Sequence, residues 1–309
     1  MDKLCLGFDT SNYTTSAAKY NGSAVTENRR RLLPVPAGAK GLRQSDAVFH
    51  HTRQLPGLLT ALLPDPDLAA IGVSVSPRQD PDSYMPCFLT GKGMGEVLGA
   101  ALGVPVHPFS HQQGHIAAAL YSAGKLDLLE REFLAFHVSG GTTEALLVSP
   151  GGAAGPDAKL AARSLDLKAG QAVDRVGVAL GLPFPCGPAL ERLALAWREP
   201  VKVRPSMRGA DCSLSGVENQ CLALIKAGHP KEEAARFCLE AITAALLEMC
   251  RVLLREHPGL PVLFSGGVCG DSILRDRLSE RFGAYFAAPE FSADNAAGVA
   301  ILACLASGC

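Results

Sequence analysis

Short apolar runs alternate with longer amphipathic stretches along the chain, which is the pattern of an α/β protein. In the first third, three strands joined by turns at Asn12 and at Asn21–Gly22 precede a helix that Asp46 can cap. A strand, a helix and a further strand follow, and this order is that of a ribonuclease H-like domain. The expected strands are residues 4–9, 14–20, 23–27, 69–75 and 104–107, and the expected helices are residues 46–63 and 91–102.

The second part of the chain repeats this order of elements. Its expected strands are residues 132–139, 143–148, 160–165 and 262–265, and its expected helices are residues 171–180, 189–197, 231–256 and 272–281. A final helix over residues 293–306 is expected to pack back on the first half. We therefore expect a first lobe of residues 1–108, joined by the C-terminal helix of residues 293–309, and a second lobe of residues 109–292.

Two hairpins, one in each half, resemble each other at a constant offset in sequence. Residues 8–20 (FDTSNYTTSAAKY) and residues 136–148 (FHVSGGTTEALLV) both run from strand through tight turn to strand. In the second hairpin, Gly140 and Gly141 let successive backbone N–H groups point into one concavity, which favours an anion such as phosphate. The matched pairs are Phe8 with Phe136, Ser11 with Ser139, Thr14 with Thr142, Thr15 with Thr143 and Ala17 with Ala145.

Duplication with two phosphate-facing hairpins is what the actin-like and sugar-kinase-like ATPase architecture requires, in which a nucleotide lies between the halves. The expected fold class is therefore α/β with duplicated ribonuclease H-like domains. The alternative is a pair of ordinary hairpins rich in glycine and threonine, since short motifs often match by chance.

A candidate metal site begins with His111 and His115 in the stretch SHQQGHI. A helix starting near Ser110 would place both imidazoles on one face. Glutamine stands where an HExxH zinc protease has its general base, so a peptidase is not indicated. Asp294 is a candidate third ligand, and two histidines with one carboxylate leave coordination positions open for a catalytic metal. The alternative for Asp294 is a plain helix N-cap.

Composition narrows the class of protein further. The 309 residues are 48% hydrophobic and 19% charged, which is typical of a globular protein of two ordinary domains, and the formal charge of −1 gives no general attraction to nucleic acid. No segment is long and apolar enough for a signal peptide or a membrane span, so we expect a cytoplasmic protein without a membrane partner. The ten cysteines form no CxxC pair, so we expect reduced, mostly buried thiols. Two basic clusters are expected in solvated loops: Arg29, Arg30 and Arg31, and Lys202, Arg204 and Arg208.

Eight stretches carry a resemblance to a known family. They are GFDTSNYTTS, SHQQGHI, VSGGTTEALLV, AGQAVDRVGVALGL, FPCGP, CSLSGV, FSGGV and PEFSADNAAGVAILA, in this order over nearly the whole chain. Together they resemble TsaD, the bacterial tRNA threonylcarbamoyladenosine synthase family, earlier described as O-sialoglycoprotein endopeptidases. The resemblance implies an acyltransferase that moves the threonylcarbamoyl group from its adenylate to the exocyclic amine of the adenosine beside the anticodon in tRNA. It also implies TsaB-like and TsaE-like partner proteins.

The resemblance further implies a ligand set for this sequence. One iron or zinc ion per subunit is expected at the positions that match His111, His115 and Asp294, where it would act as a Lewis acid. Most of the nucleotide and metal site is expected in the second lobe, and no protein nucleophile is required. Threonylcarbamoyl-adenylate, or ATP or ADP, is expected to contact His137, Val138, Ser139, Gly140, Gly141, Asp174, Gly187, Gly266, Gly267 and Asp271.

Several positions depart from the family pattern and indicate a divergent paralogue. Glu218 stands where the family has lysine and Asp271 where it has asparagine, so both would bring negative charge towards an anionic adenylate. The other departures are Tyr13 and Thr14 in place of an acidic pair, Thr142 in place of a histidine, and Ser76, Pro77 and Arg78 in place of a Gly-Pro-Gly loop.

Two other functions remain open from the sequence. One is a non-catalytic partner protein of the same fold, resembling TsaB in role, although a scaffold would not need the three candidate metal ligands. The other is a small-molecule kinase or ATPase of the same superfold, since fold alone does not fix function. A kinase would need a carboxylate that holds Mg²⁺ or acts as a base, and Asp9 is available for that role.

Overall fold

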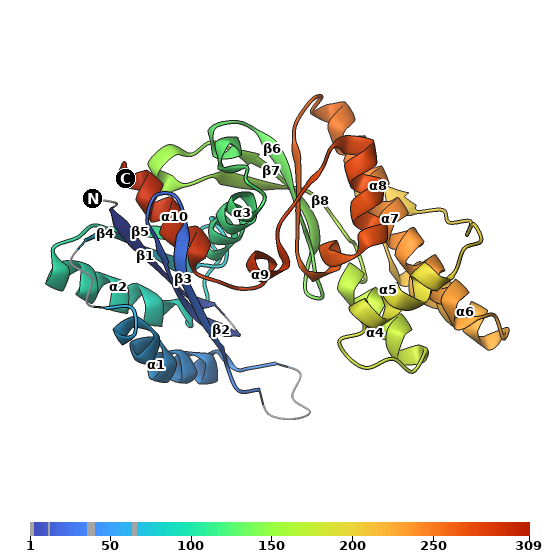
Figure 1. Ribbon diagram of the computed structural model, residues 1–309, viewed down its shortest axis with the longest axis horizontal. Coiled ribbons are helices and arrows are strands. Elements are labelled where there is room, and N and C mark those ends of the chain that lie inside the picture. Colours follow the sequence, from blue (N-terminus) through green and yellow to red (C-terminus); the bar gives the residue numbers. More distant parts are fainter. Residues whose placement is uncertain (1–2, 12, 36–40, 64–66) are drawn as a thin grey trace. The chain divides into compact units, whose positions relative to one another are not determined.

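The computed structural model describes residues 3–11, 13–35, 41–63 and 67–309. The chain divides into two compact units (Figure 1). Unit 1 comprises residues 1–131, 149–158 and 290–309, and unit 2 comprises residues 132–148 and 159–289. The first boundary lies after residue 131 and not after residue 108, so the helix with His111 and His115 belongs to unit 1. The expected second lobe of residues 109–292, which was to carry most of the nucleotide and metal site, thus differs from unit 2 in that both histidines lie in unit 1.

Unit 1 is built on a five-stranded sheet in the order β3-β2-β1-β4-β5. The first three strands form an antiparallel meander, and β1, β4 and β5 run parallel. The expected turn at Asn21–Gly22 is confirmed by a positive φ of 87° at Gly22, whereas Asn12 lies outside the described residues. The elements are β1 (Leu4–Ser11), β2 (Thr14–Tyr20), β3 (Val25–Leu32), α1 (Gln44–Thr60), β4 (Leu68–Ser76), α2 (Phe88–Leu102), β5 (Val106–Ser110), α3 (His111–Ser122), η1 (Leu126–Glu130), η2 (Gly152–Ala154), α9 (Pro289–Ser292) and α10 (Ala297–Ala306).

Unit 2 repeats the same sheet, in the order β12-β11-β6-β7-β8. Its β6 and β7 form an antiparallel hairpin, while β6, β11 and β12 run parallel, as β1, β4 and β5 do in unit 1. The expected duplication and the α/β fold class are confirmed. The elements are β6 (Phe133–Val138), β7 (Thr143–Ser149), β8 (Asp157–Arg163), α4 (Ala169–Ala179), α5 (Gly187–Ala196), β9 (Ser206–Arg208), β10 (Asp211–Ser213), α6 (Ser215–Lys226), α7 (Lys231–Glu256), β11 (Val262–Ser265), η3 (Gly267–Gly270), α8 (Ser272–Phe282) and β12 (Tyr285–Phe286).

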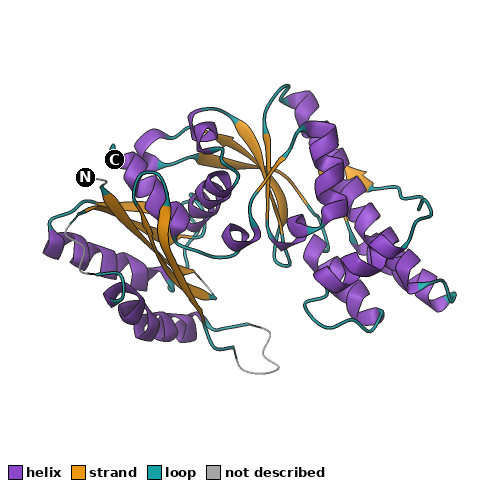
Figure 2. Cartoon of the chain, viewed as in Figure 1, coloured by secondary structure: helices purple, strands orange, loops and turns teal. Residues whose placement is uncertain are grey.

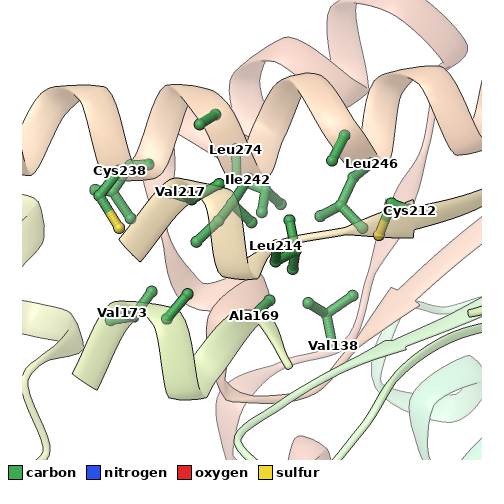
Figure 3. Close-up of a cluster of buried hydrophobic side chains, with 14 of the residues drawn as sticks. Val138, Ala169, Val173, Cys212, Leu214, Val217, Cys238, Ile242, Leu246 and Leu274 are labelled. Atoms are coloured by element: carbon green, nitrogen blue, oxygen red, sulfur yellow. The ribbon is translucent and has the colours of Figure 1, made fainter. Parts of the chain in front are cut away.

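The core of unit 2 lies between its sheet and a layer of helices centred on α7 (Figure 2). Ile242 and Leu246 of α7 face Ala169 and Val173 of α4, with Leu214 between them (Figure 3). All five side chains are buried or nearly so. Burial of apolar area on this scale is the main stabilising contribution, at about 25 cal/mol for each Å² removed from water. The packed layer fixes the start of α4 beside the hairpin of β6 and β7.

The two faces of β1 explain how unit 1 is layered. Leu6 and Phe8 point to one face and pack with the side chains of α1 and α2, whereas the intervening Gly7 lies under α10. A Cβ atom on Gly7 would lie 2.5 Å from the Ala296 carbonyl oxygen, and one on Gly72 of β4 would lie 2.1 Å from that of Val299. Glycine at both positions therefore lets α10 lie directly on the sheet, as the red helix beside blue β1 in Figure 1 shows. The last helix thus packs on the sheet of the first half.

Helices α3 and α10 also cross at a glycine contact. A Cβ atom on Gly298 would lie 1.8 Å from the carbonyl oxygen of Gly114. The two backbones can approach this closely because Gly298 has no side chain, and a Cβ atom on Gly114 would lie 3.0 Å from Cγ1 of Val299. This crossing brings the first turns of both helices together, and it is the reason that α3 belongs to unit 1.

Other differences from the expected elements follow from context. Arg29, Arg30 and Arg31 lie on β3, not in a loop, because a strand at the edge of a sheet tolerates charged, exposed side chains. Arg208 ends β9, while Lys202 and Arg204 lie in a loop as expected. Helix α6 and the β9–β10 pair were not expected from the sequence pattern.

Candidate functional site

The first candidate site starts at the N-terminus of α3. The Ser110 hydroxyl accepts a hydrogen bond from the Gln113 N–H at 3.2 Å, and the Gln113 side-chain oxygen accepts one from the Ser110 N–H at 2.7 Å. This capping box fixes the helix start at His111, so the expected helix is confirmed and His111 and His115 share one face. The Gln113 amide also donates to the carbonyls of Ala154 and Pro156. A glutamate could not make these two bonds, which explains why glutamine stands at this position.

Three ligand atoms converge at this helix face. Nε2 of His111 and Nε2 of His115 are 2.9 Å apart, and Oδ1 of Asp294 lies 3.2 Å from the second and 3.5 Å from the first. Around a metal with bonds of about 2.1 Å, neighbouring ligand atoms lie about 3.0 to 3.4 Å apart in octahedral or tetrahedral geometry. The three side chains therefore fit one metal ion, with coordination positions left for other ligands.

Asp294 is not the N-cap of the last helix. Helix α10 begins at Ala297, and the Asn295 side-chain oxygen accepts the Ala297 N–H at 3.0 Å. Asp294 instead turns its Oδ1 to the imidazoles, while its Oδ2 accepts a hydrogen bond from Thr14 at 3.3 Å. The alternative that the sequence left open is thus excluded, since the N-cap residue is Ala296 and the preceding Asn295 accepts the N–H of the first helical residue. Thr14, one of the departures from the family pattern, orients the candidate ligand.

Asp9 supports His111 from the opposite side. Its Oδ2 lies 2.8 Å from Nδ1 of His111 and accepts a short hydrogen bond from the Ser74 hydroxyl, while its Oδ1 accepts the Ser11 N–H at 2.7 Å. A carboxylate that accepts Nδ1–H leaves the lone pair of Nε2 for a metal. Under the kinase alternative, Asp9 was available to hold Mg²⁺ or to act as a base, but its oxygens already contact Ser11, Ser74 and His111.

The charges of this cluster depend on one another. Burial disfavours a charged imidazole at His111, but the carboxylates of Asp9 and Asp294 outweigh burial and raise the pKa of His111 to about 10. Burial also acts to raise the pKa of Asp294, yet the hydrogen bonds from His111 and His115 hold it well below its usual range. Without a bound metal, the proton on His111 therefore supplies part of the positive charge that balances the two carboxylates.

The second candidate site is a pocket of about 380 Å³ in unit 2. It lies between the β6–β7 hairpin, the N-terminal parts of α4 and α5, and η3. Five expected contact residues line it: Gly140, Asp174, Gly187, Gly267 and Asp271. The residues that the sequence did not indicate are Gly170, Val173, Pro185, Pro188, Glu191, Leu239, Val268 and Gly270.

The other expected contact residues shape the hairpin and do not line the pocket. The buried backbone of Val138 lies against Gly266, where a Cβ atom would come within 2.3 Å of the Val138 carbonyl oxygen. His137 bonds the Ser265 hydroxyl at 3.2 Å, and the Ser139 hydroxyl accepts the Thr142 N–H at 3.1 Å. Gly141 has open space where its Cβ would lie. These contacts hold the two glycine-containing turns next to each other.

Gly170 lines the pocket but was not predicted from the sequence. A Cβ atom there would lie 2.6 Å from the Gly140 nitrogen, and its N–H donates to the Ser139 carbonyl at 3.1 Å. The start of α4 therefore lies directly on the hairpin corner. The signal was the Ala-Gly pair at the start of the AGQAVD stretch.

Three carboxylates face this pocket. Asp174 accepts the Cys186 N–H at 2.9 Å and so ties α4 to the loop before α5. Glu191 accepts both the N–H and the hydroxyl of Ser272, and Asp271 accepts the Leu274 N–H at 3.0 Å as the N-cap of α8. Burial raises the pKa of Asp271 to about 6, and the nearby Glu191 adds to this rise. Its Oδ2 is buried without a hydrogen-bond partner in the described part of the chain.

Two other departures from the family pattern have local partners. Glu218, on α6, does not line the pocket, and its carboxylate pairs with Arg175 at 3.0 Å. The expected repulsion between Glu218 and an adenylate is thus offset by a neighbouring cation. The Arg78 N–H donates to the Ser83 hydroxyl at 3.1 Å in unit 1.

Comparison with known proteins identifies the family. A family model for TsaD, tRNA N6-adenosine threonylcarbamoyltransferase, matches residues 41–301. The chain belongs to the TsaD family. Relatives with the name tRNA N6-adenosine threonylcarbamoyltransferase include one from Methanopyrus kandleri, 27% identical over 96% of this chain and 86% of that protein. Another, from Pyrobaculum islandicum, is 28% identical over 96% of this chain and 88% of that protein.

Solved structures confirm the actin-like fold of this TsaD-family chain. Component A of the (R)-2-hydroxyglutaryl-CoA dehydratase of Acidaminococcus fermentans superimposes with a TM-score of 0.55 at 13% identity, over 99% of both chains. Full-length HypF in its phosphate- and nucleotide-bound form gives 0.58 at 12% identity, over 98% of this chain and 55% of that one. A glucokinase of Streptomyces griseus in complex with glucose and AMPPNP gives 0.51 at 12% identity, over 97% and 99%. No helix among the described residues is long and apolar enough to cross a membrane.

Proposed function

We propose that this chain transfers the threonylcarbamoyl group from threonylcarbamoyl-adenylate to the exocyclic amine of the adenosine beside the anticodon in tRNA. The amine nitrogen attacks the carbamoyl carbon, the bond from that carbon to the phosphate oxygen breaks, AMP leaves, and the nitrogen gives up a proton. The convergence of His111, His115 and Asp294 in a chain of the TsaD family carries this proposal.

The residues of unit 1 are proposed to hold iron or zinc. Bound there, such an ion supplies a Lewis acid for the carbamoyl or phosphate oxygens. Asp9 keeps Nδ1 of His111 protonated and its Nε2 directed at the ion, and Thr14 keeps Oδ1 of Asp294 turned to the same point. Fixed ligands of this kind need no rearrangement when substrate arrives.

The pocket of unit 2 is proposed to hold the adenosine part of the adenylate. Its volume is in the range of small-molecule sites. Asp174 and Glu191 can accept hydrogen bonds from ribose hydroxyls, which are donors that carboxylates favour. The same charges repel phosphate, so we place the phosphate at the N–H groups of Gly140 and Gly141, where no side chain blocks approach.

The two rival functions are less well supported. A non-catalytic partner protein would not need two histidines and a carboxylate held at ligand spacing by Asp9 and Thr14. A kinase would need Asp9 to bind Mg²⁺ or act as a base, but Asp9 is buried and its oxygens accept bonds from Ser11, Ser74 and His111.

The partners of the proposed reaction are tRNA and proteins like TsaB and TsaE, with another enzyme supplying the adenylate. We place the reaction in the cytoplasm, where tRNA is modified. The cysteines of the chain are all free thiols, as a reducing compartment requires.

A nucleoside assay tests the proposal. The chain loaded with iron or zinc is incubated with threonylcarbamoyl-adenylate, unmodified tRNA and its two partner proteins, and the digested tRNA is analysed by mass spectrometry. We expect threonylcarbamoyladenosine with the parent chain, none with His115→Ala, and parental amounts with the control His229→Ala, whose imidazole bonds Glu233 on the surface of unit 2. Equal modification with the parent and His115→Ala contradicts the metal role, and modification by the partners alone points to the non-catalytic function.

A further inference from the structure

Three cysteines that are far apart in the sequence meet in unit 1. Cys5 lies on β1, Cys304 lies in the last turns of α10, and Cys309 follows that helix. Their sulfur atoms all lie within 4.8 Å of one another. The sequence indicated only scattered, mostly buried thiols, because none of the three forms a CxxC pair.

The pairing of Cys5 with Cys304 follows from the way that α10 lies on the sheet. Gly7 on β1 lies beneath Ala300 of α10. Cys5 is two residues before Gly7, on the same face of the strand, and Cys304 is four residues after Ala300, on the same face of the helix. The glycine contact therefore sets the distance between the two fully buried sulfurs.

Cys309 joins them through the cap of α10. Gly308 has a left-handed φ of 64°, its N–H donates to the Leu305 carbonyl at 3.2 Å, and the Cys309 N–H donates to the Cys304 carbonyl at 3.0 Å. This pair of bonds is a Schellman motif, in which the last residue folds back on the residue five positions earlier and their side chains meet. The cap thus returns the Cys309 side chain to Cys304.

We propose that Cys5, Cys304 and Cys309 form a second metal site, for one thiophilic ion such as Zn²⁺ or Cu⁺. In a thiolate site with metal–sulfur bonds of about 2.3 Å, neighbouring sulfurs lie about 3.8 Å apart, so shifts of about one ångström convert the cluster into a ligand set. Soft thiolate ligands select these ions over Mg²⁺ or Ca²⁺.

The surroundings of the cluster fit an ion that enters from solvent. Cys5 and Cys304 are buried, whereas Cys309 is half-buried and gives access. A tetrahedral ion would keep its fourth position on that side for water or a small thiol. Burial raises the pKa of the Cys304 thiol, and the nearby Lys3 ammonium partly counteracts this rise.

Titration with Cd²⁺ tests the site in the full chain. Thiolate-to-metal charge transfer in the ultraviolet reports sulfur ligands only, so the histidine site is silent. We expect the charge-transfer band of the reduced parent to increase until one Cd²⁺ ion is bound per chain. We expect Cys309→Ser to lose this band. The control Cys212→Ser removes a buried cysteine of unit 2, outside the cluster, and should keep the band.

A second measurement uses the parent chain alone, so it does not depend on how well a cysteine variant folds. Alkylation of the half-buried Cys309 in the parent, followed by peptide mass spectrometry, should be slowed at least about tenfold by Zn²⁺, a change worth about 1.4 kcal/mol. Equal charge-transfer bands in the parent and Cys309→Ser overturn the proposal. So does a bond between Cys304 and Cys309 that survives a thiol reductant, since it would show a disulfide in place of the metal site.

Discussion

Nδ1 of His111 and Oδ2 of Asp9 lie 2.8 Å apart, so a buried carboxylate holds the imidazole whose other nitrogen faces the candidate metal position. Asp9 acts on His111 in two opposing ways. It orients the ring and makes it a stronger ligand, and it also stabilises the proton that competes with the metal.

We expect this competition to appear in the pH dependence of metal affinity. Because the pKa of His111 in the metal-free chain is raised to about 10, a metal that binds below that pH must displace one proton. Affinity should therefore rise about tenfold for each pH unit between about pH 7 and pH 9. Competition against a chelator of known affinity measures this slope.

The matched variant is Asp9→Asn. At about pH 9, where the proton competes least, we expect it to bind metal about 10- to 100-fold more weakly than the parent, as loss of a ligand-orienting carboxylate typically does. Its affinity should also rise less steeply with pH, because His111 loses the carboxylate that raises its pKa. Identical slopes and affinities in the two proteins would show that Asp9 has only a structural role.

The crossing of α3 and α10 predicts a strong effect of one methyl group. Gly298→Ala places a Cβ atom 1.8 Å from the Gly114 carbonyl oxygen, so the helices must separate. We expect a loss of about 1 to 3 kcal/mol in the free energy of unfolding, together with weaker metal binding, because the ligands lie on both sides of this crossing. Urea denaturation and metal titration measure the two effects.

Its control is Gly93→Ala, since the added Cβ atom on α2 meets nothing within 4 Å. That variant should be as stable as the parent or slightly more stable, because alanine favours a helix. A Gly298→Ala protein with parental stability and metal affinity would contradict the tight crossing.

Asp271 predicts a stabilising variant whose effect depends on pH. Burial raises its pKa in the folded chain to about 6, above the value of about 3.9 in an unfolded chain. The folded state therefore binds the proton more tightly, so the contribution of Asp271 to stability decreases as the pH rises from about 4 through about 6. Asp271→Asn removes the charge and keeps the capping oxygen, so it should be more stable by on the order of 2 kcal/mol at pH 7 and equal to the parent below about pH 4.

Denaturation across this pH range, with Asp271→Ala as the comparison, tests the explanation. Alanine also removes the charge but leaves the Leu274 N–H without its partner, which costs about 1 kcal/mol relative to asparagine. A constant difference between Asp271→Asn and the parent at all pH values would rule out the buried charge as its cause.

Gly140 predicts a binding defect without a folding defect. It lines the pocket of unit 2, and a Cβ atom there meets nothing within 4 Å. Gly140→Val should fold normally, because the added atoms enter open space, and should bind AMP about tenfold or more weakly, because the same space is proposed for the nucleotide. Calorimetry measures the affinity, and Gly216→Val on α6, outside the pocket, is the control. Unchanged AMP affinity in Gly140→Val would place the nucleotide elsewhere.

The sequence predicted those features that depend on local pattern. The helix that begins at His111 follows from the Ser110 cap and the histidine spacing, and the two hairpins follow from their repeated residues. The roles of Asp9 and Asp294 could not be predicted in full, because they depend on contacts across 102 and 179 residues of chain. Glu218 was expected to oppose an anion, since nothing in the linear sequence indicates its pairing with Arg175 on a different helix.

The glycine face that β1 and β4 present to α10 has a consequence for synthesis of the protein. Thr14 and Asp294 are 280 residues apart, and nearly all of unit 2 is made between them. While the chain emerges, the sheet of unit 1 therefore has no helix on its Gly7 face, although unit 2 already has the segments for its own core. Unit 1 thus begins before unit 2 and is completed after it. A chain that stops before Asp294 can contain both histidines and the whole pocket of unit 2 and still lack the third candidate ligand, so the candidate metal site can be completed only after unit 2 has been made.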